Sequence, residues 1–441
     1  MAIIIATCTL IIILASIWIV KQRYQAARWL LLPPGPPGRW LLGNAMPKSY
    51  APFQFAKWTE QYGPVFSLKQ GHRIFVVIGR HQAAVDIMEK QGANVADHPR
   101  SISVQETLSG GLRMHLEDSN ERWRRMRRVL HANLQPKVAE TYEPMQTRHV
   151  KNLVLDILND PKNHQRHAMR YSASVIMSFA YGKITPASYT DPEVVSINMF
   201  SARFGQAMKL GAYLVDAYPI LRFVPGYRSQ LNAWHKEELT FYDGQLDAVQ
   251  RQMREGTARP SFARFILEHQ KQYQLEDKGL GYLAGVIFGA GSDTTASAIT
   301  IMMMAAATHT DVQARVQEEL DNVVTVFMLE SLRWRPDIIW NNYLIPAGAT
   351  VIGNHWAIAN HPEVFPEPQT FNPQRWIDDA GCVRDDLRFF TYGFGRCQHL
   401  ANWSVFINMA LILWAFRLSE NPASKIDTLA FLDTANKTPT W

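Results

Sequence analysis

The stretch FTYGFGRCQHLA, residues 390–401, decides the fold, because it joins a glycine-punctuated loop to an apolar helix with Cys397 at the junction. Gly393 and Gly395 permit backbone geometry that other residues cannot adopt, and they let the chain pass close to a bulky partner. The free N–H groups at the start of the following helix favour a thiolate over a thiol. The pattern predicts a nucleophile or a metal ligand at Cys397, although a lone cysteine is more simply a small buried apolar residue.

The composition describes an ordinary globular protein and excludes several other classes. The chain has 441 residues, of which 47% are hydrophobic and 19% charged. Its balance of 45 Lys+Arg against 39 Asp+Glu is mildly basic and gives little support to nucleic-acid binding. The 3 cysteines, Cys8, Cys382 and Cys397, exclude a disulfide scaffold and a cysteine-rich zinc site.

The N-terminal region predicts a membrane anchor. Residues 2–20 contain no charge and are long enough to span a bilayer as a helix, and the basic residues Lys21, Arg23 and Arg28 follow the run rather than precede it. We therefore expect a transmembrane anchor at 1–20, a basic and Pro-rich hinge at 21–44, and one domain over 45–441 on the cytosolic side. The expected location is the endoplasmic reticulum membrane, with a single pass.

Helical periodicity dominates the middle of the chain. Residues 51–63 read as a helix, and two strand-like runs on either side of Gly71-His72 read as a hairpin. From about 120 to 315 nearly every segment has a helical period. Within residues 121–134, Trp123 and Arg127 lie four apart and share a helix face. The neighbouring arginines indicate either a solvated surface or a face that meets an anion or an acidic partner.

The apolar segment 281–307 carries a polar interruption at its middle. Gly291 costs up to about 1 kcal/mol relative to alanine in a helix, and Asp293 is expensive to bury unless it is paired. With Thr294 beside it, this pattern predicts a local opening of the helix where something binds. The alternative is a kinked core helix with a satisfied aspartate.

Two further pieces precede the cysteine loop. In MLESLRWRP, residues 328–336, Glu330 and Arg333 lie three apart and would pair on one helical face. Residues 344–376 are rich in Pro, Asn and Gly, which predicts irregular structure with one short strand at ATVIGN. This region ends in FNPQRW, which contains Arg375.

In this order the pieces resemble the cytochrome P450 haem-thiolate monooxygenases of the membrane-bound, fungal microsomal kind. The resemblance implies a mainly α fold with small β-sheets (α+β), forming a single catalytic domain behind the N-terminal transmembrane helix. It also implies haem b with its iron on the Cys397 thiolate. The implied site residues are Trp123, Arg127 and Arg396 for haem binding, Gly291, Asp293 and Thr294 for oxygen activation, and Glu330, Arg333 and Arg375 as a structural triad.

The resemblance further implies a reaction and partners. Thiolate-ligated haem inserts one oxygen atom from O₂ into a lipophilic small molecule by hydroxylation or epoxidation. Electrons would come from NADPH through NADPH-cytochrome P450 reductase, with cytochrome b5 as a second donor, and the arginines around Trp123 would steer the reductase. Fungal secondary metabolism or xenobiotic oxidation is the expected role. A peroxide-rearranging or dehydrating enzyme shares the fold, but Asp293-Thr294 favours O₂ activation.

The sequence departs from the family pattern inside matching runs. Arg396 is followed at once by Cys397, and segments are missing on either side of MLESLRWRP and at the C-terminal end. The shortened cysteine loop predicts that the chain gives little of the thiolate absorption band under carbon monoxide. The alternative function is a non-catalytic or haem-deficient, membrane-tethered relic, or a defective gene model. Substrate contacts are expected from Ser101–Arg113, Phe204–Leu214 and Phe288–Ala290.

Overall fold

The computed structural model describes most of the chain between Leu32 and Thr428. The described residues are 18, 32–40, 42–47, 50–71, 73–92, 97–184, 190–209, 211–277, 279–318, 331–333, 338–341, 343–346, 348–378, 384 and 399–428. The chain divides into two compact units. Unit 1 contains Met1–Ala45, Pro52–Pro99 and Leu329–Leu387, and unit 2 contains Met46–Ala51, Arg100–Met328 and Arg388–Trp441.

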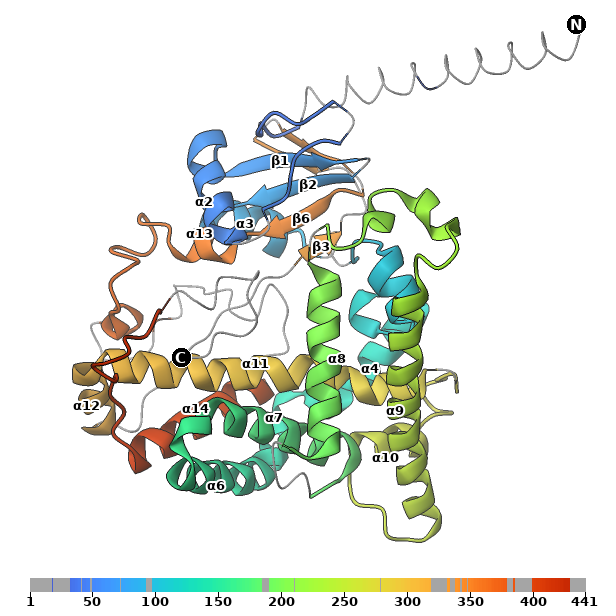
Figure 1. Cartoon of the computed structure of the whole chain (residues 1–441), viewed down its shortest axis with the longest axis vertical. Helices are drawn as coiled ribbons and strands as arrows, with labels where there is room; N and C mark the ends of the chain where they lie inside the picture. The colour runs from blue at the N-terminus through green and yellow to red at the C-terminus, as the bar shows by residue number, and fades with distance from the viewer. Residues whose placement is uncertain are drawn as a thin grey trace, which may run out of the picture. The chain divides into compact units, whose positions relative to one another are not determined.

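Unit 1 is built on a four-stranded sheet in the order β1-β2-β6-β3 (Figure 1). Its strands are β1 (Val65–Gln70), β2 (Arg73–Ile78), β3 (Ser331–Arg333) and β6 (Thr350–Gly353), and β4 (Ile338–Trp340) with β5 (Tyr343–Ile345) forms a separate pair. β1 and β2 are antiparallel, β2 and β6 parallel, and β6 and β3 antiparallel. The helices of this unit are α2 (Ala51–Tyr62), α3 (His81–Ala84), η1 (Val85–Glu89), α13 (His355–Ala359) and η8 (Pro373–Trp376).

The hairpin at Gly71 and the strand at ATVIGN are confirmed as β1–β2 and β6. The helix predicted around Arg333 is wrong, because Ser331–Arg333 pairs with β6 as a strand. An isolated helical turn is costly to nucleate, whereas strand pairing satisfies the backbone groups of even three residues. Glu330 lies outside the described residues.

Unit 2 is helical, as the periodicity predicts (Figure 1). Its long helices are α4 (Glu121–Leu134), α6 (Glu143–Asn159), α7 (His164–Tyr181), α8 (Pro192–Met208), α9 (Ser229–Arg254), α11 (Leu280–Thr308) and α14 (His399–Ala415). The shorter ones are η2 (Ile102–Leu108), η3 (Met114–Leu116), α5 (Pro136–Ala139), η4 (Glu140–Tyr142), η5 (Pro161–Asn163), η6 (Leu214–Asp216), η7 (Pro219–Phe223), α10 (Phe262–Glu268) and α12 (Thr310–Glu318). The mainly α fold with a small sheet is thereby confirmed.

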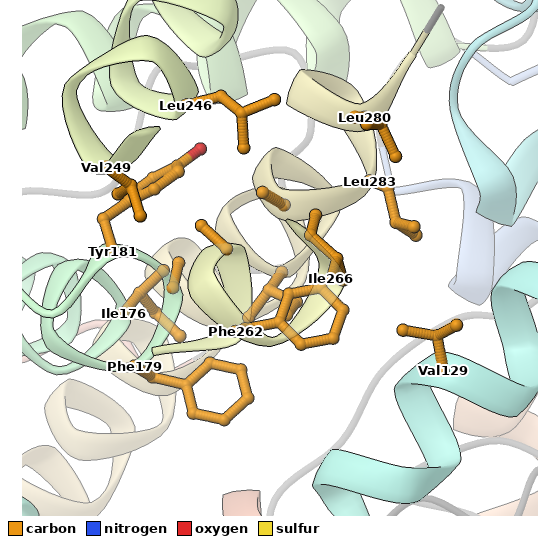
Figure 2. Close-up of a cluster of buried hydrophobic side chains, with 14 of the residues drawn as sticks. Val129, Ile176, Phe179, Tyr181, Leu246, Val249, Phe262, Ile266, Leu280 and Leu283 are labelled. Atoms are coloured by element: carbon orange, nitrogen blue, oxygen red, sulfur yellow. The ribbon is translucent and has the colours of Figure 1, made fainter. Parts of the chain in front are cut away.

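Helix α11 is the central element of unit 2, and α7, α9 and α14 pack along it. The largest buried cluster lies where α7, α9, α10 and α11 meet, and Figure 2 shows its members converging from these helices. The cluster contains Ile176, Phe179, Tyr181, Leu246, Val249, Phe262, Ile266, Leu280 and Leu283. Phe179 and Phe262 stack with ring centroids 5.9 Å apart. This core holds α11 in place.

The Pro-rich stretch, expected to be a hinge, is folded against β1 over residues 32–40 and 42–44. The amide of Ser67 donates to the carbonyl of Pro34 (2.9 Å), and the amide of Lys69 donates to the side chain of Asn44 (2.8 Å). Because β1 is an edge strand, these bonds satisfy backbone groups that would otherwise face solvent. We call residues 32–44 the strap.

The anchor predicted at residues 2–20 lies outside the described residues, with the exception of Trp18. Within the described part of the chain, no helix combines the length and the apolar character that crossing a bilayer requires.

Candidate haem site

Helix α4 begins with a favourable N-terminal cap. The side chain of Asn120 accepts a hydrogen bond from the Trp123 amide (2.8 Å), and Glu121 occupies the first turn. Both features stabilise the positive end of a helix dipole, so they offset the repulsion among the arginines that follow.

Trp123 and Arg127 lie on one face of α4, as their spacing predicts. The guanidinium carbon of Arg127 lies 5.0 Å from the centroid of the Trp123 ring, which is a cation–π contact. Trp123 is half-buried against the core cluster of unit 2, whereas Arg127 is exposed. The pair presents an indole N–H and a guanidinium close together, and these are donors that suit a carboxylate.

The other arginines of α4 divide into two groups. Arg122 donates to the carbonyl of Gly111 (3.0 Å) and to Glu117 (2.9 Å), and Arg125 donates to the carbonyl of Gln274 (3.1 Å). These two arginines fasten α4 to neighbouring loops. Arg124 and Arg128 are exposed and lie near Glu121, so they and Arg127 make up the solvated basic face. This division could not be predicted from the sequence, because the partners of Arg122 and Arg125 lie in other segments.

Helix α11 runs from Leu280 to Thr308 as one helix, so the local opening expected at its middle is not observed. A Cβ added at Gly291 would lie 2.3 Å from Cδ1 of Ile176 on α7. A Cβ added at Gly285 would likewise lie 2.5 Å from Cδ1 of Tyr242 on α9. The glycines therefore let α7 and α9 approach α11 closely, which accounts for Gly291 by helix packing without any ligand.

The hydroxyl-bearing residue Thr294 is half-buried on α11, one turn after Gly291. For Asp293 the structure describes the backbone alone, which is helical. The helix thus places Gly291, Asp293 and Thr294, the three residues expected at the oxygen site, within about one turn. Their roles remain predictions.

The cysteine loop itself, including Arg396 and Cys397, lies outside the described residues. Its continuation is described: α14 begins at His399, as the apolar pattern after the loop predicts. The hydroxyl of Tyr171 on α7 lies 3.0 Å from the Ser404 hydroxyl on α14. Burial raises the pKa of Tyr171 to about 12, so this phenol stays protonated and holds α14 against α7.

The far end of α14 is held by two glutamines of α12. Gln317 donates to the carbonyls of Leu413 (2.8 Å) and Phe416 (3.0 Å), and Gln313 both donates to and accepts from Leu418 (2.7 Å each). These bonds satisfy carbonyl groups left open at the end of a helix. The helix that follows the cysteine loop is therefore fixed at its middle and at its end.

The predicted triad is only partly described. Arg375 donates to three backbone carbonyls of its own loop, those of Asn372 (3.2 Å), Glu367 (3.0 Å) and Thr370 (2.7 Å). Arg333 lies in β3, where the structure describes its backbone only. The pairing of Arg375 with Glu330 and Arg333 stays a prediction.

Sequence reasoning missed a buried polar network in unit 2. Arg113 forms an ion pair with Glu238 on α9, and the hydroxyl of Tyr282 on α11 donates to the same carboxylate (2.8 Å). Burial alone would lower the pKa of Arg113, but Glu238 and the surrounding phenols raise it overall. His235 lies beside Tyr282 (Nδ1 to hydroxyl, 3.1 Å). No local pattern in the sequence predicts a pair such as Arg113 and Glu238, which lie 125 positions apart in the chain.

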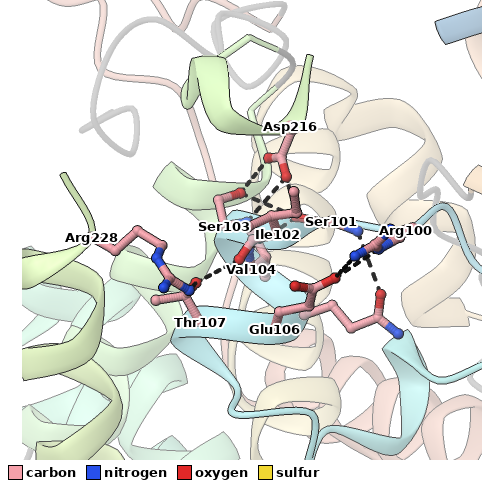
Figure 3. A network of polar contacts seen from close by, with 10 residues as sticks. Arg100, Ser101, Ile102, Ser103, Val104, Glu106, Thr107, Asp216 and Arg228 are labelled. Carbon is pink, nitrogen blue, oxygen red and sulfur yellow. Dashed lines mark hydrogen bonds and ion pairs between the residues drawn. The ribbon is translucent and has the colours of Figure 1, made fainter. Parts of the chain in front are cut away.

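A second network fixes the start of the segment that carries Arg113. Asp216 accepts from the Ser101 hydroxyl (3.2 Å), the Ser103 amide (3.1 Å) and the Ser103 hydroxyl, as Figure 3 shows. Asp216 lies two residues after the stretch Phe204–Leu214, which is one of those expected to contact substrate. Apolar residues of these and neighbouring segments also pack into one cluster, formed by Val104, Leu108, Leu116, Ala207 and Leu231 with Phe204, Tyr213 and Trp234 against it.

The donors described here fit haem, which carries two propionate carboxylates. Arg127 and the Trp123 indole supply charge and N–H groups of the kind a carboxylate accepts, and both belong to unit 2 together with α11 and the start of α14.

The cytochrome P450 family model matches the chain over residues 33–332 and 333–437. Cytochrome P450 monooxygenase 64 of Postia placenta is 50% identical over 441 aligned positions, covering 92% of this chain and 89% of its own length. Monooxygenase 88 of the same fungus is 51% identical over the same shares. Monooxygenase fogE of Aspergillus ruber is 29% identical over 96% of this chain and 87% of its own length.

These comparisons also locate differences from the family. The family match is interrupted between residues 332 and 333, inside strand β3. The alignment with monooxygenase 64 is as long as this whole chain, yet only 92% of the chain takes part, so the relative has residues without a counterpart here. The break in the family match falls within MLESLRWRP, where the sequence predicts missing segments. The matches cover the predicted site from α4 to α14, and the chain belongs to the cytochrome P450 family of fungal monooxygenases.

Proposed function

We propose that the protein hydroxylates or epoxidises a lipophilic small molecule with O₂, in fungal secondary metabolism or in xenobiotic oxidation. The observation that carries the haem assignment is the contact between Arg127 and Trp123, a donor pair for a carboxylate on the helix where the family pattern requires one. Three fungal relatives that are named as cytochrome P450 monooxygenases support the reaction class.

In this proposal different residues of the chain bind the haem and supply protons. Cys397 would ligate the iron of a bound haem, and Trp123, Arg127 and Arg396 would hold its propionates. The haem, when bound, supplies the oxidising power that no amino-acid side chain has. Asp293 and Thr294 hold and pass protons to the oxygen site.

Gly291 keeps α11 close to α7, and this close packing fixes the position of the turn that carries Asp293 and Thr294. The triad of Glu330, Arg333 and Arg375 would stabilise the loops of unit 1. Its assignment follows from the family pattern.

Electrons are proposed to come from NADPH through NADPH-cytochrome P450 reductase, with cytochrome b5 as a second donor. The exposed arginines Arg124 and Arg128 form the basic face that an acidic reductase would meet. Residues 2–20 are proposed to anchor the protein in the endoplasmic reticulum membrane, with the catalytic domain of residues 45–441 in the cytosol.

The reaction is tested with the full chain in bilayers, together with a reductase, NADPH and isotopically labelled O₂. We expect one labelled oxygen atom in the oxidised product from an apolar substrate panel, and none with Cys397→Ala. Label from water, or equal activity of Cys397→Ala, would refute the proposal. A haem-free relic, the second candidate, predicts no absorption in the Soret region and no effect of Cys397→Ala; the comparisons do not favour it.

A further inference from the structure

The position of helix α14 bears directly on Cys397, because only Gln398 separates this cysteine from His399, the first residue of the helix. A metal ligand functions only when its donor atom is held within about 0.5 Å of the productive position. With Arg396 directly before Cys397, few residues can absorb a displacement of the helix. The contacts that hold the first turns of α14 are therefore expected to influence the sulfur.

Apolar packing does not by itself define where α14 lies along α11. The interface consists of hydrophobic side chains, which are Ala298, Met302 and Ala306 of α11 with Val405, Met409 and Leu413 of α14. Burial of apolar surface is non-directional, and methionine side chains adapt readily to a changed neighbour. Such an interface tolerates a small displacement of the helix, so a directional contact is needed to fix it.

Tyr171 of α7 makes a directional contact with the second turn of α14. Its hydroxyl lies 3.0 Å from the hydroxyl of Ser404, and the side chain of Asn408 donates to the carbonyl of Ser404 (2.6 Å). All three residues are buried, with exposed fractions of 0%, 4% and 0% for Tyr171, Ser404 and Asn408. Because a buried polar group without a partner costs free energy, this hydrogen bond favours one position of the helix over its neighbours.

The helix that carries Tyr171 is itself well fixed. The adjacent Arg170 forms an ion pair with Asp156 on α6 (2.6 Å). One end of the same helix pair is joined by His149, whose Nε2 lies 2.9 Å from the hydroxyl of Ser178. Helix α7 therefore provides a rigid support against which the start of α14 is held.

The opposite end of α14 is held separately. Gln313 and Gln317 of α12 bond to backbone groups between Leu413 and Leu418. These contacts lie beyond the middle of the helix, whereas Ser404 lies in the turns that follow Cys397. Losing the bond to Ser404 would thus free the end that is joined to the cysteine.

We propose that Tyr171 is a positioning residue for Cys397. Its hydrogen bond with Ser404 holds the first turns of α14 in place and thereby sets the position of the sulfur that would ligate a haem iron. This inference rests on the proposed function, in which Cys397 is the iron ligand. It gives a role to a buried phenol that is not among the site residues predicted from the sequence.

The test uses the full chain with haem bound, reduced under carbon monoxide, and compares the haem that shows the thiolate band with the haem that does not. Tyr171→Phe should lower this ratio about fivefold from its wild-type value, which is the usual effect of one buried hydrogen bond on an equilibrium. The reduction potential should rise as well, because an anionic thiolate stabilises the oxidised iron and weaker ligation removes that stabilisation.

Ser404→Ala removes the other hydroxyl of the same bond and should have the same effect. It also keeps the test valid if Tyr171→Phe fails to fold. The double variant should lower the ratio no further than either single variant, because only one bond is lost. Additive losses would overturn the inference.

Gln317→Ala is the matched control at the far end of α14. It removes two hydrogen bonds, to the carbonyls of Leu413 (2.8 Å) and Phe416 (3.0 Å), and should lower the thermal unfolding midpoint. The thiolate ratio and the reduction potential should stay at their wild-type values. A decrease in the ratio equal to that of Tyr171→Phe would show a general loosening of the helix and overturn the positioning role.

The outcomes also separate this inference from the proposed function. A thiolate band that disappears in Cys397→Ala but is unchanged in Tyr171→Phe and Ser404→Ala would overturn the inference and leave the ligand assignment standing. Haem bound to the wild type without any thiolate band would overturn the ligand assignment and the inference together.

Discussion

Arg113 and Glu238 form an ion pair whose two side chains keep only 3% and 2% of their surface exposed. They lie 125 positions apart in the sequence, and their contact joins the segment after η2 to helix α9. Arg113 also lies over the ring of Phe204 on α8, 4.5 Å from its centroid. The position of the segment that carries Arg113, relative to α8 and α9, therefore depends on the ion pair between Arg113 and Glu238.

Removing the charge of Glu238 should destabilise unit 2 strongly. Glu238→Gln leaves the guanidinium of Arg113 buried without its counter-ion, and breaking a buried pair in this way costs about 3–5 kcal/mol. The free energy of unfolding, measured by denaturant titration, should fall by this amount. The neighbouring Glu237 pairs with Arg203 at 2.5 Å but is 52% exposed. Glu237→Gln should therefore cost less than about 1 kcal/mol, and equal losses for both variants would contradict the account.

Because Gly291 packs closely against α7, replacing it with alanine should lower the stability of the protein. Gly291→Ala places a methyl group against Ile176, and overpacking of this kind costs about 1–3 kcal/mol. Gly244 on α9 has no atom within 4 Å of an added Cβ, so Gly244→Ala should instead stabilise the protein by about 0.5–1 kcal/mol. Thermal unfolding midpoints measure both changes.

A second substitution tests whether contact with Ile176 causes the loss of stability in Gly291→Ala. Ile176→Val removes the closest methyl group and should restore part of the stability lost in Gly291→Ala. If the loss persists unchanged in the double variant, contact with Ile176 is not its cause.

The strap should depend on the side chain of Asn44. Asn44→Ala removes two hydrogen bonds that join the strap to itself and to β1, which should cost about 1–3 kcal/mol. Hydrogen exchange should then accelerate at the amides of Ser67 and Lys69 while β2 stays protected. Asn44→Asp keeps the oxygen that accepts from Lys69 and should lose less protection there. Unchanged exchange in Asn44→Ala would show that the strap is held by other contacts.

Acid should weaken the contact between α6 and α7 through His149. Burial, together with the charges of Arg148 and Arg170, lowers the pKa of His149 from 6.5 to about 4. As the pH falls below 6.5, the unfolded chain takes up a proton at this position and the folded chain does not until about pH 4. Stability is therefore full above pH 6.5 and is lost between pH 6.5 and 4, by on the order of 3 kcal/mol.

His149→Gln should flatten this part of the pH profile of the unfolding temperature. His131 at the end of α4 is exposed, and His131→Gln should leave the profile as in the wild type. An unchanged slope in His149→Gln would mean that other groups cause the loss in acid.

Local patterns in the sequence predicted much of the fold. The apolar spacing of residues 51–63 and 121–134 led to the helices α2 and α4, and Gly71 marked the hairpin of β1 and β2. Trp123 and Arg127 were placed together correctly because helical spacing alone sets their contact. Such features depend on neighbours within a few positions, and periodicity contains that information.

Contacts between distant segments could not be predicted in the same way. The strand β3 depends on pairing with β6, and the strap depends on the free edge of β1. The bond between Arg113 and Glu238 depends on how α9 lies against the segment after η2. In each case the partner is chosen by tertiary packing, which overrides local propensity.

The central claim is that Cys397 is the iron ligand of a haem-thiolate monooxygenase, and the carbon monoxide difference spectrum of the reduced full chain tests it most directly. Because Arg396 and Cys397 are adjacent, we expect a thiolate band that is small relative to the haem bound. The band should survive in Cys382→Ala and disappear in Cys397→Ala. A band that persists in Cys397→Ala, or haem bound to the wild type without any such band, would contradict the account.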